Sequence, residues 1–516
     1  MICVPLNEYK DLPKRIRKEC PEIYINFKYI SILEKYLTDI FNKVKDRIES
    51  EYVDINRGWH ESNGVTKFDD SVNGIEYLRQ LGIIYDGNNT APIVRVDDKI
   101  DKRWEYFNDG KRFINVGKKG KEITAIYLFG FLGFAKYWIE KAMIQCHFVL
   151  YVCGMTNSLK TSVVQCVTNV FEQDVRKKNL RFTGTRASIL DYISTHQDDT
   201  ILVDDFSNTE VTSKKNSREM IETILRVAGD DMIPTKMGSS GEIHYRNFRC
   251  AIVMTGETEA DLSKSSQLRM MKVNVDRNTF DGYELRRFQE NPQIMRVHLA
   301  QFILFLEEYG NAMIPKMKER IQSMRETFRN EFEPRFVDTI VVYKLLIMLW
   351  GEFGRWAGYD SAMLYEESER FEEHILDIMR QNESYCKFLN PGIQFIYAME
   401  KIIVSDAKAM IACSEEVFNL DDKAYVGFYE QGEEVMWLKF DNMYKMVRAY
   451  WQGLGIDFIS TTKQVKESLC QCGLIRTTQN SRGGIDYTIK AKKGRRQRMV
   501  VFYVKKYKKI LEENEV

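Results

Sequence analysis

Apolar positions along the chain change their period, and these changes divide it into regions. Between residues 148 and 275, short apolar runs alternate with stretches of helical period. The runs 148–153, 200–204 and 249–255 predict strands, while 160–171 and 217–228 predict helices. Alternation of this kind is typical of a three-layer α/β core with a parallel sheet. A helix is predicted over Ile123–Met143, before the first strand, and residues 285–440 have a mostly helical pattern.

The two ends of the chain have other rhythms. Residues 1–120 combine a helical pattern at Ile30–Glu49 with short strand-like pieces at 52–56, 64–68 and 93–96. Near the other end, helical patterns at Asp441–Gln452 and Thr462–Cys472 precede strand-like pieces at 473–478, 487–490 and 498–504, the order of a winged helix. We therefore predict an α+β N-terminal domain (1–120), an α/β core (121–360), an acidic, mostly helical region (361–440) and a winged-helix domain (441–516).

Composition narrows the class of protein. A hydrophobic content of 44% is that of a folded globular protein. The ten cysteines are scattered, which favours reduced, buried thiols over a disulfide framework. The longest apolar run, Ala125–Ile139, contains Lys136 and falls short of the ~20 residues that span a bilayer. The first residues hold no signal-peptide core, so we expect a soluble, cytoplasmic protein without a membrane partner.

The net charge of +1 conceals an asymmetry. From Thr461 to Ile510 there are fourteen Lys or Arg against two acids, whereas Tyr365–Phe440 holds sixteen acids against seven bases. A strongly basic end on a neutral protein indicates a polyanionic partner for that end.

A phosphate-binding loop is predicted directly after the first strand of the core. The sequence approximates G-x-x-x-x-G-K-[ST], in which backbone N–H groups and a helix N-terminus face phosphate oxygens. Lys160 would lie between the β- and γ-phosphates, and the Thr161 hydroxyl would bind Mg²⁺. Leu159 replaces the second glycine of the pattern, and a surface turn remains the alternative. The predicted nucleotide-binding residues are Gly154, Met155, Thr156, Asn157, Ser158, Leu159, Lys160, Thr161 and Ser162.

The next strands of the core end in polar residues that suit ATP hydrolysis. Asp204 and Asp205 close an apolar strand, as the Mg²⁺-binding and water-polarising acids of a Walker B element do, although the second is usually glutamate. Thr255 ends the following strand and is the candidate sensor 1 residue, with Glu257 as the second choice. Arg269 lies about a dozen residues further on, where an arginine finger would stabilise transition-state charge; a solvated turn arginine is the alternative.

The segment Phe148–Val275 resembles the AAA+ core of the DUF927 proteins, including replicative helicases of staphylococcal mobile elements. The matching stretches are VLYVCGMTNSLKTS, RFTGTRASILDYISTHQDDTILVDDF, and RNFRCAIVMTGE followed by SSQLRMMKVNV. The tract at Arg57–His60 and Gly64–Phe68 is similar to their N-terminal signature, and the likeness extends over about residues 50–360.

The resemblance implies a hexameric, DNA-translocating ATPase ring that uses ATP and Mg²⁺. It implies that Arg269 acts on the nucleotide of a neighbouring subunit, and that Arg335, which opens a helix after the core, is a sensor 2 candidate for the γ-phosphate. The turn at 238–241 predicts a β-hairpin, which in such helicases lines the ring channel. Single-stranded DNA in that channel would meet Lys236, His244 and Arg246; an ordinary surface hairpin is the alternative.

The basic end is the second predicted DNA-binding surface. A helix preceded by Ser460 and Thr461 would enter the major groove of a duplex or fork, with a wing around Arg482. The predicted phosphate contacts are Lys463, Lys466, Arg476, Arg482, Lys490, Arg495, Arg496 and Arg498.

Three functions fit these features. The first is an ATP-dependent DNA helicase of a mobile genetic element, acting in replication. The second is an ATP-switched DNA-binding initiator or regulator that does not unwind. The third is a defence or signalling ATPase whose basic end binds RNA or protein. Only the helicase requires DNA-stimulated turnover in a closed ring.

Overall fold

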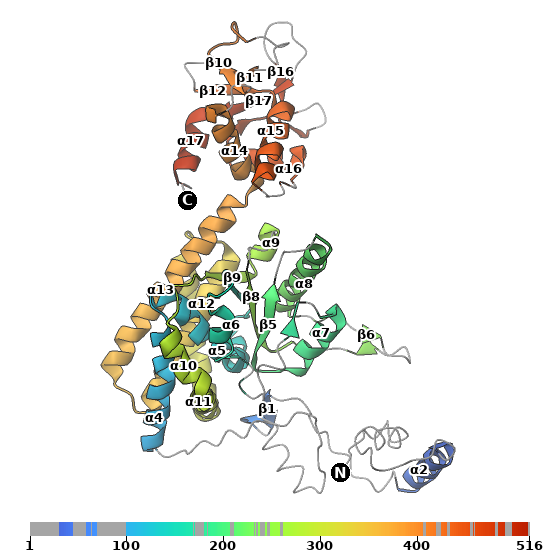
Figure 1. Cartoon of the computed structure of the whole chain (residues 1–516), viewed down its shortest axis with the longest axis vertical. Coiled ribbons are helices and arrows are strands. Elements are labelled where there is room, and N and C mark those ends of the chain that lie inside the picture. Colours follow the sequence, from blue (N-terminus) through green and yellow to red (C-terminus); the bar gives the residue numbers. More distant parts are fainter. Residues whose placement is uncertain are drawn as a thin grey trace. The chain divides into compact units, whose positions relative to one another are not determined.

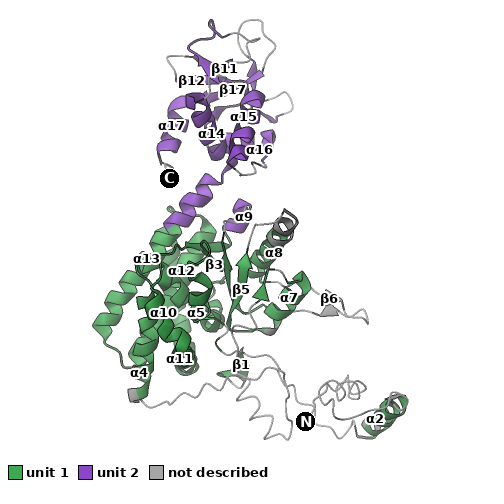
Figure 2. Ribbon diagram, in the orientation of Figure 1, with its two compact units in different colours: residues 1–262, 268–379 green, residues 263–267, 380–516 purple. Residues whose placement is uncertain are grey.

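The structure of the chain is a computed structural model that divides into two compact units (Figures 1 and 2). Unit 1 comprises residues 1–262 and 268–379, and unit 2 comprises 263–267 and 380–516. The description covers residues 30–44, 58–62, 64–69, 100–168, 170, 180–182, 184–206, 211–231, 233, 236–237, 243–244, 248–257, 262–405, 409–418, 425–430, 434–454, 458, 460–479, 483–490 and 498–513.

A five-stranded sheet forms the centre of unit 1, in the order β4-β5-β8-β3-β9. All neighbouring strands in it run parallel. Every residue of β3 is buried, which is typical of a strand covered on both faces and explains its uninterrupted apolar run. The strands are β3 (Val149–Cys153), β4 (Leu180–Arg181), β5 (Thr200–Phe206), β8 (Ala251–Gly256) and β9 (Met270–Asn274).

Helices cover both faces of this sheet (Figure 1). On one face, α7 (Arg186–Thr195) and α8 (Val211–Asp230) bury Ile193 and Ile224 against alternate residues of the strands. On the other face lies α5 (Lys121–Lys141), which contacts β5, β8 and β9 and itself packs against α11 (Gln293–Phe328) and α12 (Pro334–Trp356). This arrangement confirms the predicted α/β class with a parallel sheet in three layers. No helix in the described ranges is long and apolar enough to cross a membrane.

A short N-terminal hairpin is anchored on the amino ends of the sheet strands. It consists of β1 (Gly58–Ser62) and β2 (Val65–Asp69). The Trp59 amide donates to the Asp198 carboxylate at 2.7 Å, and Arg249 binds the same carboxylate through Nε at 3.2 Å. Burial raises the pKa of Asp198 to about 6 against the opposing effect of Arg249. Gly58 is required here, because a Cβ would lie 2.4 Å from an Asp198 oxygen and its φ is +132°.

Most of the other expected N-terminal elements lie outside the described residues. The predicted strands at 52–56 and 93–96 belong to this group. The helical pattern at Ile30–Glu49 corresponds to α2 (Ile30–Val44), and α4 (Ile100–Lys111) with the 3₁₀ helix η4 (Arg112–Val116) leads into α5.

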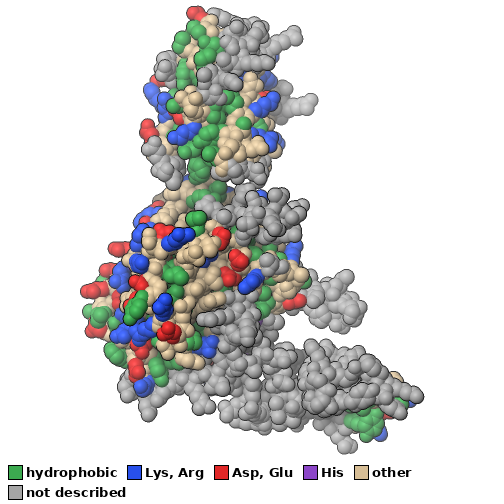
Figure 3. Space-filling model, in the orientation of Figure 1, with side chains coloured by type: hydrophobic (Ala, Val, Ile, Leu, Met, Phe, Trp, Pro, Cys, Tyr) green, Lys and Arg blue, Asp and Glu red, His purple; other side chains and the backbone are tan. Residues whose placement is uncertain are grey.

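The acidic side chains of α13 (Ser361–Phe388) are partly neutralised within unit 1. Lys111 Nζ lies 2.6 Å from Glu367 Oε1, Lys121 Nζ lies 2.6 Å from Asp377 Oδ2, and Lys344 on α12 pairs with Glu372. Figure 3 shows acidic and basic side chains intermixed on this side of unit 1. The charge of this helix therefore serves packing inside the unit, at least in part. Unit 1 also contains α10 (Gly282–Glu290), which lies between β9 and α11 in the sequence.

Unit 2 combines helices with a six-stranded mixed sheet in the order β10-β11-β12-β17-β13, in which β16 also pairs with β17. The strands are β10 (Met410–Ala412), β11 (Tyr425–Glu430), β12 (Val435–Leu438), β13 (Ile475–Arg476), β16 (Ile489–Lys490) and β17 (Arg498–Tyr503). The helices are α9 (Lys264–Gln267), α14 (Pro391–Ser405), α15 (Phe440–Gly453), α16 (Thr462–Gln471) and α17 (Val504–Glu513). A separate pair, β14 (Thr478–Gln479) with β15 (Ile485–Asp486), occupies the position predicted for a wing.

The region we expected to be helical as far as residue 440 contains three strands instead. β12 pairs antiparallel with β17, so residues 410–438 belong to the same sheet as the C-terminal strand. All four residues of β12 are buried. A short, wholly apolar run gives no periodicity to separate strand from helix, which explains the difference. The helix–helix–strand order predicted after residue 440 is present, in a sheet larger than that of a lone winged helix.

Candidate nucleotide site

The loop that joins β3 to α6 (Lys160–Val164) has the backbone of a tight phosphate-binding turn. The Gly154 amide donates to Gly256 O at 3.0 Å, and a Cβ on Gly154 would lie 2.3 Å from Val275 O, so only glycine fits there. Leu159, which replaces the usual second glycine, takes the left-handed conformation with φ 61°. The turn therefore forms with a side chain in place, at a cost of roughly 1–2 kcal/mol relative to glycine.

Two polar side chains of this loop are buried without partners. Lys160 is 9% exposed, and its ammonium makes no hydrogen bond or ion pair with any described residue. Ser158 is 2% exposed, and its hydroxyl also has no hydrogen-bond partner. A lysine whose ammonium has no counter-charge among the described residues is available to bind an anion. The loop is therefore suited to an anionic ligand.

A hydrogen-bond chain links this loop to the carboxyl ends of β5 and β8. Thr161 Oγ1 donates to Asp204 Oδ1 at 2.9 Å, and Thr255 Oγ1 donates to the same oxygen. Thr255 also accepts from the Asp205 amide at 3.2 Å. A hydroxyl and a carboxylate side by side form a ligand pair of the type Mg²⁺ accepts. The donor set therefore fits the predicted divalent cation.

Asp205 and Thr255 differ in solvent exposure. The pairing of β5 with β8 shifts register between Val203 and Phe206, and Asp205 has φ 68° and an exposed side chain. Thr255 is fully buried and uses its hydroxyl on Asp204 and Asp205. Its hydroxyl is therefore engaged with the Asp204 carboxylate and the Asp205 backbone amide, and the sensor 1 role of Thr255 stays a prediction. Glu257 lies beyond the strand, and its carboxylate accepts from the Thr156 hydroxyl of the loop.

The two predicted arginines lie at the amino ends of the sheet strands, opposite the loop. Arg269 precedes β9, and its carbonyl accepts from the amide of Val149, the first residue of β3. The loop follows the last residue of β3. The five residues of this strand, at ~3.3 Å each, therefore separate its amino end, where Arg269 lies, from the loop by about 17 Å. Arg269 donates to Asp230 at 3.1 Å, and its stem lies against Gly229.

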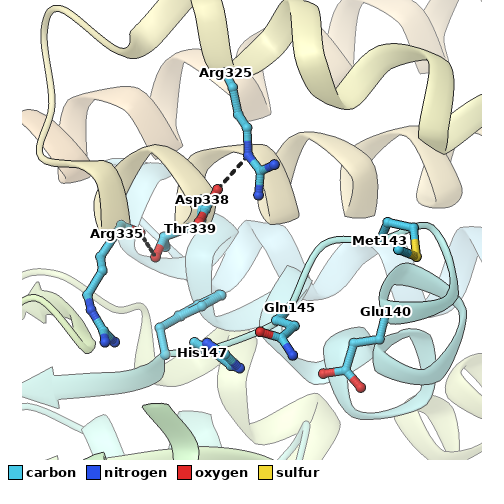
Figure 4. A pocket seen from close by; sticks show the side chains of 9 residues that line it. Glu140, Met143, Gln145, His147, Arg325, Arg335, Asp338 and Thr339 are labelled. Carbon is cyan, nitrogen blue, oxygen red and sulfur yellow. Dashed lines mark hydrogen bonds and ion pairs between the residues drawn. The ribbon is translucent and has the colours of Figure 1, made fainter. Parts of the chain in front are cut away.

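Arg335 accompanies Arg269 at this end of the strands. It lines a cavity of about 470 Å³ together with His147, Arg325 and Asp338 (Figure 4). Its Nη1 is buried and makes no hydrogen bond with any residue that the structure describes, while Arg325 Nε pairs with Asp338 at 2.8 Å. Burial and the neighbouring Arg269 lower the pKa of Arg335. Neither arginine lies beside Lys160 of its own chain.

The predicted DNA contacts fall into three groups. Arg246, Arg482, Arg495 and Arg496 lie outside the described residues. Lys236 and His244 are partners in the backbone register of the two-residue antiparallel pair β6 (Lys236–Met237) and β7 (Ile243–His244), which is the hairpin expected before β8. The remaining residues, all in unit 2, are Lys463, Lys466, Arg476, Lys490 and Arg498.

These five side chains differ in the contacts that they make within unit 2. Lys463 is 81% exposed and lies 3.7 Å from Glu467, and Lys490 is also exposed. Lys466 lies 4.6 Å from the Phe440 ring and 3.7 Å from Asp441, and Arg476 lies 6.0 Å from the Tyr503 ring. Arg498 pairs with Asp486 and donates through Nε to Thr488 Oγ1 at 2.9 Å. Thr461 forms a capping box with Gln464 at the start of α16.

One buried charge network was not foreseen from the sequence. Lys136 on α5 is 1% exposed and lies 3.2 Å from Asp231, whose carboxylate also accepts a hydrogen bond from His147 Nε2 at 2.8 Å. This network adjoins the Arg335 cavity through His147. The interruption of an apolar helix by Lys136 was the available signal, since such a lysine requires a buried acid.

Comparison with sequence-family models gives no match, and comparison with curated proteins gives none. Among solved structures, the chain is similar to the active helicase Cch of SCCmec type IV, with a TM-score of 0.57 and 13% identity over 98% of this chain and 88% of that one. Weaker likenesses are to the apo A form of the NrS-1 C-terminal region (TM-score 0.33, 11% identity, 92% and 90% covered) and to inhibitor-bound JCV helicase (0.28, 14%, 62% and 80%). The first likeness shows a shared fold, and the membership in the DUF927 family stays a prediction.

Proposed function

We propose that this chain is an ATP-hydrolysing motor that acts on DNA, a helicase or translocase of a mobile genetic element. The observation that carries the proposal is Lys160, which is buried and has no partner among the described residues, next to the Thr161–Asp204 hydrogen bond at 2.9 Å. A cation, a hydroxyl and a carboxylate at the carboxyl ends of buried parallel strands are the groups that bind a nucleoside triphosphate and its Mg²⁺. The fold shared with the Cch helicase supports the same reading.

Each group of the site has a role in this proposal. Lys160 and backbone amides of residues 154–162 bind the β- and γ-phosphates, since the Lys160 ammonium has no partner among the described residues. Thr161 and Asp204 hold Mg²⁺, which supplies charge neutralisation on the phosphates. Asp205, exposed at the end of β5, polarises the attacking water. Thr255 fixes Asp204 and the Asp205 backbone, and Glu257 is a second carboxylate at the exposed side of the loop.

The positions of the arginines support an active site shared between copies. Lys160 lies at the carboxyl ends of the sheet strands, and Arg269 and Arg335 lie at the amino ends, about 17 Å away. A head-to-tail ring, such as a hexamer, would place these amino ends against the loop of the next copy. Arg269 then acts as an arginine finger there, and Arg335, with a buried Nη1 that makes no hydrogen bond with any described residue, is a second phosphate contact of the same kind.

DNA would be bound at two places. The β6–β7 hairpin presents Lys236 and His244 from the segment before β8, which we propose to face single-stranded DNA in the ring channel together with Arg246. The exposed Lys463 and Lys490 of unit 2 would contact the backbone of a duplex or fork. Arg482, Arg495 and Arg496 are proposed to belong to the same surface.

An ATP-switched initiator that assembles on DNA without unwinding uses the same loop and the same basic side chains. The two functions differ in turnover. A motor must hydrolyse ATP repeatedly and faster on DNA, whereas a switch needs one hydrolysis event for each assembly cycle.

The test of the proposed function is steady-state ATP hydrolysis with and without single-stranded DNA, for wild type, Lys160→Ala and Asp204→Asn. We expect DNA-stimulated turnover in wild type and a loss of at least about 10²-fold in both variants. Lys318→Ala removes an exposed lysine of α11, to which the proposal assigns no role, and is the matched control. Equal turnover in wild type and Lys160→Ala would refute the assignment of the loop.

A further inference from the structure

The side of the sheet on which a nucleotide base would lie follows from the strand order. The groups proposed for Mg²⁺ and the γ-phosphate belong to β5 and β8, on one side of β3. The remainder of a triphosphate bound to the loop after β3 therefore extends toward the other side, where β9 lies. The three inter-strand steps from β5 to β9 cover about 14 Å. This inference rests on the proposed function.

The segment after β9, residues 275–282, lies at that place and is held by backbone hydrogen bonds. We call it the wall. Val275 donates to Cys153 O at 2.8 Å, so the chain leaves β9 directly beside the start of the loop. It is then tied to the segment before α5, since Lys118 donates to Thr279 O at 3.0 Å and Asp281 donates to Val116 O at 2.7 Å. The wall ends at α10, whose first residue, Gly282, is in contact range of the loop: a Cβ there would lie 3.6 Å from Leu159 Cδ1.

Tyr283 is presented from the end of this wall. Its backbone is fixed, because the Asp281 carboxylate accepts from the amides of Tyr283 at 2.8 Å and Glu284 at 3.3 Å. Its side chain is 82% exposed and makes no ring contact or hydrogen bond with any described residue. Leu159, whose Cδ1 would lie 3.6 Å from a Cβ on the preceding residue Gly282, is 37% exposed. An exposed aromatic ring on a fixed backbone, one residue from a glycine close to a partly exposed leucine, is a suitable platform for a flat ligand.

We propose that Tyr283, with Leu159, forms the base subsite of the nucleotide site, in which the tyrosine ring stacks on the purine of the bound nucleotide. Leu159 then has a second consequence beyond its left-handed backbone, since a glycine at that position would offer the base no apolar surface. Stacking is the same in the ground state and in the transition state, so Tyr283 contributes to KM and not to kcat.

The test is a competition binding assay with a fluorescent ATP analogue, in which ATP and inorganic tripolyphosphate are the two competitors. Tyr283→Ala should weaken ATP about tenfold and leave tripolyphosphate unchanged, because only ATP has a base to stack. Tyr283→Phe keeps the ring and should bind ATP as wild type does. Tyr365→Ala removes another exposed tyrosine, on α13, and is the matched control for loss of an exposed ring.

Steady-state kinetics give the second readout. Tyr283→Ala should raise the KM for ATP by about the same tenfold factor with kcat unchanged. Unchanged ATP affinity in Tyr283→Ala, or an equal loss of ATP and tripolyphosphate, would overturn the stacking role. Lys160→Ala separates the two proposals: it should weaken both competitors, and if it weakens neither, the nucleotide site itself is wrong.

Discussion

Replacing Thr255 with valine tests whether this residue positions the acids or contacts phosphate. The Thr255 hydroxyl is buried, donates to Asp204 Oδ1 and accepts from the Asp205 amide at 3.2 Å. Valine has nearly the same shape, so Thr255→Val removes both hydrogen bonds without emptying the site. Thr255→Ser keeps the hydroxyl and is the matched control.

The size of the effect follows from the bonds that are lost. A hydrogen bond to a charged group contributes about 1.5–3 kcal/mol, and the Asp205 N–H loses its side-chain acceptor as well. A loss of this size in the orientation of the two acids corresponds to a fall in kcat of about 10- to 100-fold. The KM for ATP should change less than about twofold, because Lys160 and the loop backbone are untouched.

The assay is ATP turnover as a function of Mg²⁺ concentration, with a thermal unfolding curve for each variant. We expect Thr255→Val to require more Mg²⁺ for half-maximal turnover, since Asp204 is less well held, and Thr255→Ser to resemble wild type. A variant that loses ATP affinity with an unchanged Mg²⁺ response would refute the reasoning and restore Thr255 as a direct phosphate contact.

Three further predictions concern other parts of the chain. Arg269→Ala subunits should be inactive alone and regain turnover when mixed with Lys160→Ala subunits; no recovery at any ratio would contradict a shared site. Burial raises the pKa of Asp198 from 3.8 to about 6, so the native chain binds this proton more tightly than the unfolded chain, and stability is lost as pH rises from about 4 to about 6, by ~3 kcal/mol from this group. Urea unfolding should show a smaller fall over that window in Asp198→Asn, and an unchanged slope would exclude this residue as its source. Lys463→Ala and Lys490→Ala should each weaken DNA binding and reduce the salt slope by about 1, whereas Arg498→Ala, whose guanidinium is paired with Asp486, should change the slope less; equal effects would contradict that distinction.

The sequence was sufficient for the core of unit 1 because its strands are short, apolar and bounded by turns. The run before Gly154 is the fully buried strand β3, and the two acids end β5, which β8 separates from β3 in the same sheet. In a parallel sheet the carboxyl ends of the strands meet at one edge, so the proximity of Thr161 to Asp204 follows from the fold class.

Other features depend on contacts between distant segments, which no local pattern encodes. The attachment of Trp59 to Asp198, the burial of Thr255 between two acids, and the pairing of β12 with β17 all belong to this kind. Arg335 opens its helix as expected, but its place beside Arg269 depends on how α12 packs against α5. The exposure of Tyr283 likewise became visible only once the course of the chain after β9 was known.

The central claim is that this chain couples ATP hydrolysis at Lys160 to work on DNA. Strand displacement on a forked DNA, with ATP and with wild type and Lys160→Ala side by side, tests it most directly. The account predicts ATP-dependent unwinding by wild type and none by Lys160→Ala. Robust ATP hydrolysis without unwinding on forks tailed at either end would contradict the motor and favour the ATP-switched initiator.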